Sequence, residues 1–425
     1  MLTRPAGIVA GAALAFQLCA ASAGDTVKIA FLGSLTGPTA LMGEEQLKTF
    51  NTAAELVNTR ARIYGGRTIE IVPFDNKGNP QEALVVLKRA IDQDIHFVAT
   101  SRSNIALAVS DAVVKHNARN PDRRVLFLDY LGLDPALTES KCNFWHFRFN
   151  PHSDMQVNVL TDYMAKQPSI HKVYLINADY AFGQAVRRAA REMLTTKRPD
   201  IQVVGDDLVP LQKVKDFAPY VAKIRASEAD SILTGNFGSD LSLLVKASHE
   251  AGLKATYYTI NGGLPGTWAS VGAAGAEGVK TMDLWHINAA DPAWEKALLY
   301  YRAKYHADSN LDYLSAFSSV EMLAAAMNKA GTIDPVKVGY ALEGMKYVGP
   351  SGESWMRAED HQLIAPLYIL NLVKAGQPGV KHDIEGTGLG WKTEAFIDAK
   401  DAVPPIKCQM SGRQGDAVSI WVLAR

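Results

Sequence analysis

Residues 27–38 read VKIAFLGSLTGP, an apolar run that ends in a turn. The mostly apolar residues at 27–32 are typical of a β-strand buried on both faces, and Gly37-Pro38 marks a turn before a predicted helix at 43–58. Further strands are predicted at 68–74, 95–99 and 125–129, with helices at 80–91 and 104–116 between them. Strands that alternate with helices in this way form a parallel sheet covered by helices on both faces. We therefore predict an α/β fold.

The same alternation starts again at residue 172. The predicted strands lie at 172–177, 201–209, 231–234 and 256–260, and the predicted helices at 182–195, 217–226 and 240–251. Two successive series of the same unit predict two doubly wound parallel-sheet lobes instead of one large sheet. Beyond residue 285 we expect helices at 292–305, 313–330 and 335–342, a strand at 367–373, and a tail rich in Gly and Pro from residue 376 onward.

The first 23 residues have the features of a secretory signal peptide. Arg4 supplies a positive charge, residues 8–18 form an apolar run, and Ala21-Ser22-Ala23 offers small side chains for cleavage after Ala23. The apolar run is much shorter than the roughly 20 residues of a membrane-spanning helix. We therefore expect a mature chain that works outside the cytoplasm, the alternative being a buried first helix.

The three cysteines bear on the same question of location. Cys19 lies within the expected signal peptide, and Leu18 before it is larger than the residue that a lipoprotein signal places there. Cys142 and Cys408 then remain as an even number of cysteines in an oxidising compartment, which predicts a disulfide between them. Two unrelated buried thiols are the alternative.

Charge and motifs narrow the range of functions. The chain carries 44 Lys and Arg residues against 44 Asp and Glu residues, with no basic stripe of the kind that nucleic-acid-binding proteins show. We therefore expect no nucleic-acid partner. The motifs of a nucleophile elbow, a zinc-binding helix, a dinucleotide fingerprint and a phosphate loop are not found. We predict that the protein is not an enzyme and uses no cofactor or metal.

Hydroxyl, amide and aromatic side chains follow the predicted strands. Ligands of open parallel sheets bind at the carboxyl ends of the strands, where helix N-termini present N–H groups. The segments at these ends are 35–38, 101–104, 129–132, 179–183, 235–238 and 261–263. They predict a neutral, aromatic pocket that holds a small molecule and has few groups for proton transfer. Asn104, Tyr130 and Asn236 are candidate binding residues on this ground.

These segments resemble periplasmic binding proteins of the leucine/isoleucine/valine type. The resemblance runs over about 27–373 and rests on ordered matches such as KIAFLGSLTGP at 28–38, LMG at 41–43 and DYAFG at 179–183. It implies the type I fold, in which two doubly wound lobes, joined by a three-stranded hinge, close around a ligand. The implied parts are a signal peptide at 1–23, a first lobe of 25–148 and 287–345, a second lobe of 149–286 and 346–400, and a C-terminal tail at 401–425.

The resemblance also implies roles for single residues. Ser103 matches the hydroxyl at a helix N-terminus that holds the ligand carboxylate, the alternative being a plain helix cap. Leu131 and Gly132 match the loop whose backbone contacts the ligand. Met42 stands in place of an aromatic wall, and Phe182 stands where members of the family place a Tyr over the ligand, with simple core packing as the alternative.

Two positions depart from the amino-acid binders of this family. Those proteins hold the ligand ammonium with an acidic residue after the strand that matches 256–260, and here that position is Asn261. Arg102 is expected either to pair with a second acidic group of the ligand or to point to solvent. The expected ligand is therefore a small carboxylate with an apolar or aromatic body, with neutral amides and urea-like compounds as alternatives.

The implied function is that of the extracytoplasmic solute-binding component of an ABC importer. We expect a periplasmic monomer that delivers its ligand to an ABC permease in the inner membrane. The alternatives are a sensor subunit of the same fold that feeds a signalling partner, and an extracytoplasmic hydrolase.

Overall fold

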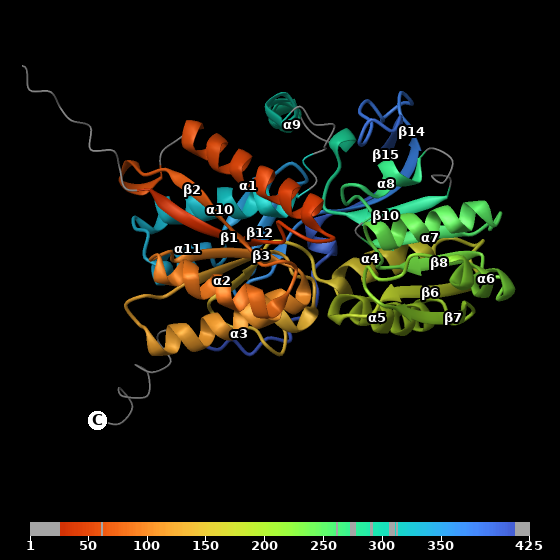
Figure 1. Ribbon diagram of the computed structural model, residues 1–425, viewed down its shortest axis with the longest axis horizontal. Helices are drawn as coiled ribbons and strands as arrows, with labels where there is room; N and C mark the ends of the chain where they lie inside the picture. Colours follow the sequence, from red (N-terminus) through yellow and green to blue (C-terminus); the bar gives the residue numbers. More distant parts are fainter. Residues whose placement is uncertain are drawn as a thin grey trace, which may run out of the picture.

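The computed structural model describes residues 26–60, 63–260, 262–272, 278–289, 292–305, 311 and 313–412. The expected signal peptide at 1–23, its cleavage site after Ala23, Asn261 and the end of the tail at 413–425 lie outside the described residues. The chain forms two lobes that lie side by side (Figure 1), each built on its own sheet. Among the described residues, no helix has the length and apolarity needed to cross a bilayer.

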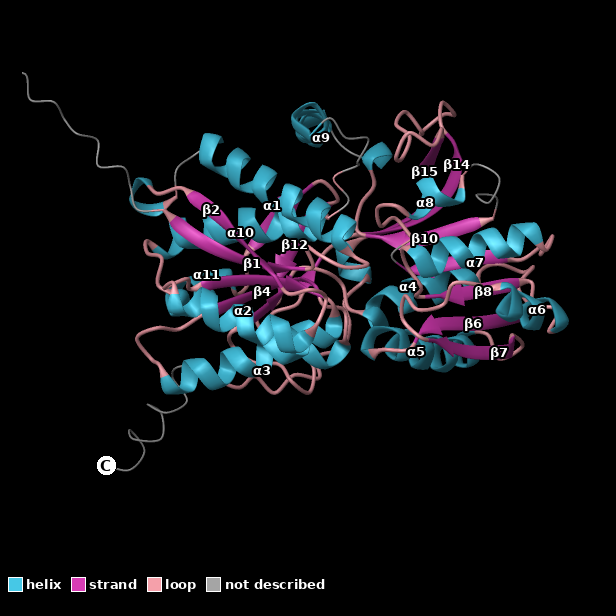
Figure 2. Ribbon diagram, viewed as in Figure 1, coloured by secondary structure: helices cyan, strands magenta, loops and turns pink. Residues whose placement is uncertain are grey.

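The first lobe contains a five-stranded parallel sheet of order β2-β1-β3-β4-β5. Its strands are β1 (Val27–Gly33), β2 (Ile69–Asp75), β3 (Phe97–Ser101), β4 (Leu126–Leu131) and β5 (His146–Arg148). Helices α1 (Ala40–Arg60) and α10 (Leu314–Ala330) pack together over one face, and α2 (Pro80–Asp92) and α3 (Ser103–Arg119) over the other (Figure 2). Helix α11 (Pro335–Leu342) packs against α10.

The second lobe contains a seven-stranded sheet of order β15-β14-β10-β9-β8-β6-β7. The parallel strands are β6 (Lys172–Ala178), β7 (Gln202–Val209), β8 (Ser231–Thr234), β9 (Thr256–Ile260) and β10 (Val279–Asp283). The antiparallel edge consists of β14 (Leu367–Lys374) and β15 (Leu389–Ile397). The helices are α4 (Ser153–Ala165), α5 (Ala181–Lys197), α6 (Ala218–Ala226), α7 (Ser239–Glu250) and α8 (Thr267–Val271). The predicted fold class, two doubly wound α/β lobes, is confirmed.

The predicted tail from residue 376 onward is wrong in part, because strand β15 lies within it. β15 pairs with β14 from Leu389 to Ile397. The side chains of Leu389 and Trp391 are buried in the hydrophobic core of the second lobe. A Gly-rich segment precedes β15, and its composition led to the prediction of a tail in place of this strand. Helix α4 also escaped prediction, because its buried residues cover most of its surface and leave no clear amphipathic period.

A third, antiparallel sheet of β11 (Lys346–Gly349), β12 (Gly352–Met356) and β13 (Leu363–Ile364) follows α11. The structure places it against the first lobe, whereas the expected division assigned residues from 346 onward to the second. The hydroxyl of Tyr347 donates to Glu321 Oε2 of α10 at 2.6 Å, and the rings of Phe147 and His361 stack at 3.9 Å. The lobe boundaries themselves stay a prediction.

The chain passes from one lobe to the other after β5, after β10 and after β13. The middle passage includes helix α9 (Pro292–Tyr305), which lies above the junction of the lobes in Figure 1. At the first passage, the buried Gln362 side chain accepts from Arg148 Nε at 2.7 Å and donates to the Asn150 carbonyl at 2.9 Å. Side-chain hydrogen bonds thus tie the chain segments between the lobes to each other.

The predicted disulfide between Cys142 and Cys408 is confirmed, with a Cα–Cα distance of 5.8 Å. It holds the chain beyond residue 401 on the first lobe. Lys407 forms an ion pair with Glu139 at 3.1 Å next to the disulfide, and the Phe144 backbone N–H donates to the Ser411 carbonyl at 2.8 Å. The alternative of two unrelated thiols is therefore wrong.

Candidate functional site

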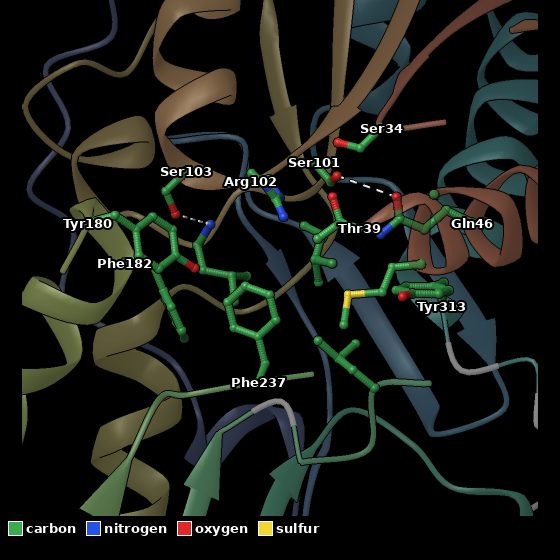
Figure 3. Close-up of a pocket in the computed structure, with 15 residues that line it drawn as sticks. Ser34, Thr39, Gln46, Ser101, Arg102, Ser103, Tyr180, Phe182, Phe237 and Tyr313 are labelled. Atoms are coloured by element: carbon green, nitrogen blue, oxygen red, sulfur yellow. Dashed lines mark hydrogen bonds between the residues drawn. The ribbon is translucent and has the colours of Figure 1, made fainter. Parts of the chain in front are cut away.

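A cavity lies between the lobes, at the carboxyl ends of the parallel strands (Figure 3). The wall formed by the first lobe is rich in polar groups, and the wall formed by the second lobe is largely aromatic and apolar. The first-lobe residues that line the cavity are Ser34, Thr39, Met42, Gly43, Gln46, Ser101, Arg102, Ser103, Leu131, Leu133 and Tyr313. The second-lobe residues are Tyr180, Phe182, Phe237 and Leu264.

In both lobes, a glycine in the first turn of a helix places the preceding side chain at the cavity. Gly43 lies in the first turn of α1, where a Cβ would collide with the carbonyl oxygen of Ser34 at the end of β1. Gly183 lies in the first turn of α5, where a Cβ would collide with the carbonyl oxygen of Ala178 at the end of β6. Each glycine lets its helix start directly against the preceding strand. The residue before each glycine, Met42 or Phe182, therefore faces the cavity.

Ser103 is the first residue of α3, and 1% of its surface is exposed. Its Oγ accepts the backbone N–H of Leu133 at 3.1 Å, so the hydroxyl retains its own proton for donation to a ligand. The residue before the helix is Arg102, which makes no side-chain cap hydrogen bond. The first N–H groups of a long helix have no partners within the helix and carry partial positive charge. Ser103 and this helix end together favour a negatively charged group.

Arg102 faces the cavity and gives it a positive charge. Burial lowers the pKa of its guanidinium, although the guanidinium remains charged. Its Nη2 lies 3.5 Å from Gln212 Oε1, and it forms no salt bridge with any carboxylate in the described part of the chain. Its φ of 70° is in the left-handed region, a strained conformation that is found most often at binding and catalytic sites. Arg102 is half-buried and lines the cavity, and its pairing with a second acidic group of the ligand stays a prediction.

Tyr130 was expected at the ligand, but it lies in the core behind the cavity. Its ring contacts Phe31 and Phe50, with a centroid distance of 4.9 Å to Phe50, and it is fully buried. Its hydroxyl donates to Gln46 Oε1 at 2.8 Å, and the Ser101 hydroxyl lies 3.4 Å from the same oxygen (Figure 3). Because both hydroxyls can donate to the Gln46 oxygen, the Gln46 amide can turn its N–H groups toward the cavity.

The second lobe contributes an aromatic wall. Phe182 and Tyr180 lie with ring centroids 5.9 Å apart, and Tyr180 and Phe237 with centroids 6.3 Å apart. Burial raises the pKa of the Tyr180 hydroxyl, which therefore stays neutral. Figure 3 shows these three rings on the side of the cavity opposite Gln46. Such a wall suits the apolar or aromatic body of a ligand.

The other predicted residues have different positions. Leu131 lines the cavity, whereas the Gly132 backbone N–H donates to Asp129 Oδ1 at 2.5 Å and shapes the loop from behind. Asn104 lies on α3 beyond the lining residues. Asn236 is fully buried behind Phe237, and its side-chain polar atoms have no partner among the described residues.

Several lining residues had no role in the sequence analysis, among them Gln46, Tyr313 and Leu264. Gln46 lies one helical turn after Met42, so the period of α1 places both on one face, a signal that the sequence did contain. Tyr313 precedes α10 and Leu264 follows β9. Their place at the cavity depends on how distant segments pack, and no local pattern marks it.

The described lining of the cavity has groups that suit binding. It includes one guanidinium, several hydroxyls and an amide, and none of the described lining residues carries a carboxylate or an imidazole. Across the described residues, no three His, Cys, Asp or Glu side chains gather as metal ligands would. The arrangement can orient a small anion and enclose its apolar part.

Known proteins of similar sequence match most of the length of this chain. Leu/Ile/Val-binding protein homolog 4 of Brucella abortus (strain 2308) is 29% identical over 411 residues, 95% of this chain and 97% of its own length. The leucine-, isoleucine-, valine-, threonine-, and alanine-binding protein of Pseudomonas aeruginosa is 23% identical over 78% of this chain and 85% of its own length.

Solved structures share the two-lobed fold. The closed conformation of the leucine-, isoleucine-, valine-, threonine-, and alanine-binding protein from Brucella ovis has a TM-score of 0.81 and 28% identity, over 91% of this chain and 99% of that chain. A solute binding protein of an ABC transporter from Rhodopseudomonas palustris BisB5, in complex with 3,4-dihydroxy benzoic acid, shares the fold with a TM-score of 0.75 and 19% identity, over 88% and 98% of the chains. A family model described as periplasmic binding protein matches residues 26–377, both lobes with the cavity between them. This chain therefore belongs to the periplasmic binding protein family.

Proposed function

We propose that the protein is the extracytoplasmic solute-binding component of an ABC importer and that it binds a small carboxylate with an apolar or aromatic body. Arg102 is the observation that carries this proposal. A guanidinium that is largely removed from water and has no carboxylate partner among the described residues is costly unless an anion arrives with the ligand.

The two walls define how the ligand is oriented. Its carboxylate lies at Arg102, the Ser103 hydroxyl and the N-terminus of α3. Its body lies against Phe182 and Phe237 of the other lobe. Since these groups come from different lobes, a ligand that contacts both favours the closed arrangement.

Names of relatives support the carboxylate part of the ligand class. The Brucella and Pseudomonas relatives are named for branched-chain and other amino acids, which are small carboxylates. The Rhodopseudomonas structure contains an aromatic acid, but at its level of identity it supports the fold alone. The N-terminal sequence and the family together support a periplasmic monomer that docks on an inner-membrane permease.

A thermal-shift panel on the purified chain tests this proposal. The panel contains branched-chain and aromatic amino acids, benzoates, aliphatic carboxylates and the matching amides. We expect one class of carboxylates to raise the melting temperature, with Kd in the micromolar range, on the order of −8 kcal/mol. Native mass spectrometry should show the same class among co-purified ligands. If no carboxylate shifts the melting temperature and none co-purifies, the proposal is wrong.

A sensor subunit of the same fold remains the second candidate, and uptake by whole cells separates the two. Deletion of the gene should abolish uptake of the identified ligand at micromolar concentration. Unchanged uptake together with a lost transcriptional response to the ligand would favour the sensor.

A further inference from the structure

A second, small cavity adjoins the one described above. The two share Leu131, Leu264 and Tyr313 as a common wall. The second cavity lies between the ends of β5 and β10, near the passages between the lobes, and none of the predicted site residues except Leu131 lines it. A ligand that extends past the common wall would therefore meet a different set of groups.

Asp283, the last residue of β10, supplies the one carboxylate among the lining residues of this cavity that the structure describes. Its Oδ1 accepts the Leu284 backbone N–H at 2.7 Å, and the carboxylate also accepts the Trp285 backbone N–H. Its Oδ2 faces Gly263, where an added Cβ would lie only 2.7 Å from the oxygen, so the glycine leaves room beside Oδ2 on that side. Within the described residues, Asp283 forms no salt bridge, and burial raises the pKa of its carboxyl to about 7.

Gln156 adds a second acceptor from another element. The side chain lies on α4 with 2% of its surface exposed, and it lines the same cavity. Its Nε2 donates to the Pro151 carbonyl at 2.9 Å and to Asn150 Oδ1 at 3.3 Å, which fixes the orientation of the amide. Its Oε1 has no hydrogen-bond partner among the described residues. The Asp283 carboxylate, which has no cationic partner among the described residues, and the Gln156 Oε1 atom, which has no donor there, are complementary to a cationic group with several N–H bonds.

The order of the strands sets the distance between the two charged ends. Arg102 follows β3 and Asp283 ends β10, which lies across the cleft from β5 at the second cavity. In the first sheet, β4 lies between β3 and β5, and in the second sheet, β9 lies between β8 and β10. The strands of each pair are therefore two strand spacings apart. At about 4.8 Å per strand, the ends of β3 and β5 lie roughly 10 Å apart, and this spacing separates the backbone of Arg102 sideways from the second cavity. In an α-amino acid a single carbon joins the ammonium to the carboxylate, so an α-amino acid does not span this distance.

Given the proposed function, on which this inference rests, we propose that the ligand is an ω-amino carboxylate. Its carboxylate lies at Arg102 and Ser103, its apolar chain or ring passes Leu264 and Tyr313, and its ammonium binds to Asp283 and Gln156 in the second cavity. This assigns to Asp283 the role of a specificity-determining residue.

Isothermal titration of the purified chain with matched pairs tests this assignment. In each pair, a methyl group replaces the ammonium: 5-aminopentanoate against hexanoate, and 4-(aminomethyl)benzoate against 4-ethylbenzoate. We expect the amino compound of at least one pair to bind ten times more tightly or better. Asp283→Asn keeps an oxygen for the Leu284 N–H and should remove the preference while hexanoate or 4-ethylbenzoate binds as before.

Asp179→Asn is the matched control, because Asp179 follows β6 in the same lobe but lines neither cavity. It should retain the preference. Equal affinity within both pairs, or a preference that survives in Asp283→Asn, would overturn the role of Asp283 and leave the proposed function standing. If all four compounds and the carboxylate panel fail to bind, the proposed function itself is wrong.

Discussion

Arg102 of the first lobe and Gln212 of the second lobe meet across the cleft, with Nη2 of the arginine 3.5 Å from Oε1 of the glutamine. The backbone N–H of Gln212 in turn donates to Asp240 Oδ2 at 2.8 Å, in the first turn of α7. The group expected to bind the ligand carboxylate is thus in contact with the opposite lobe.

Asp240 makes stability depend on pH. Burial raises the pKa of its carboxyl to about 6, above the value of about 3.9 in an unfolded chain. The folded protein therefore holds this proton more tightly, and the Asp240 contribution to the free energy of unfolding falls as pH rises from about 4 to about 6. Asp240→Asn keeps an oxygen for the Gln212 N–H. It should raise the free energy of unfolding by about 1 kcal/mol at pH 8, less than the full shift implies because water partly screens the group.

Urea denaturation at pH 4 and pH 8 checks this expectation. At pH 4 the variant and the wild type should agree, since both groups are then neutral. Asp122→Asn, an exposed position in the turn after α3, is the control and should show no gain at pH 8. A variant that is less stable than the wild type at pH 8 would contradict the account.

Ser103→Ala should lower both the ligand affinity and the free energy of unfolding, each through the loss of a different hydrogen bond. Loss of a hydrogen bond to a charged ligand group costs roughly 1.5–3 kcal/mol, so affinity should fall at least tenfold. The Leu133 N–H also loses its acceptor, which should lower the free energy of unfolding by about 1 kcal/mol. Ser110→Ala, on the same helix, removes an acceptor of Asn143 Nδ2 away from the cavity and should lower stability alone. Equal affinity of the two variants would refute the role of Ser103.

The disulfide should stabilise the fold without shaping the cavity. Cys142 and Cys408 are separated by 266 residues, so the chain-entropy estimate of the stabilisation is about 5.6 kcal/mol. Reduction should lower the melting temperature of the wild type and leave that of Cys142→Ser/Cys408→Ser unchanged. Ligand affinity should stay within twofold, because the lining of the cavity includes no residue near the disulfide. A tenfold loss of affinity on reduction would contradict this separation.

Arg148 should be essential for the stability of the loop at 134–138, which borders the site. Its guanidinium is fully buried and donates to Gln362, to the carbonyl of Asp134 at 2.6 Å and to Thr138, and burial lowers its pKa to about 10. Arg148→Lys leaves several acceptors unpaired and should reduce the free energy of unfolding by about 3 kcal/mol. The exposed Arg119→Lys should have no effect. A change below about 0.5 kcal/mol in Arg148→Lys, measured by urea denaturation, would show that the network is dispensable.

The sequence predicted those strands and site residues that are marked by a pattern within a short run of residues. Strands such as β8 and β9 were placed within their observed bounds because short apolar runs between turns mark buried strands. β10 and β15 have mixed composition and are held in place by neighbours far along the chain, so no run marks them. Ser103 and Phe182 follow strands directly and could be found at the strand ends.

Asp283 shows why the rest of the site could not be predicted. The sequence offers Asn261 where the family places an acid, which argues against an ammonium group in the ligand. Only the pairing of β10 with β9 brings a carboxylate to the neighbouring strand end, and only the packing of α4 brings Gln156 to it. Such relationships between strands and helices arise in the folded chain alone.

The central claim is that Arg102 binds the carboxylate of the ligand, and the Kd values of one tight-binding carboxylate and its carboxamide test it most directly. The wild type should prefer the carboxylate by at least thirtyfold, and Arg102→Gln should bind both compounds with similar, weaker affinity. An equal preference for the carboxylate in Arg102→Gln and in the wild type would contradict the account.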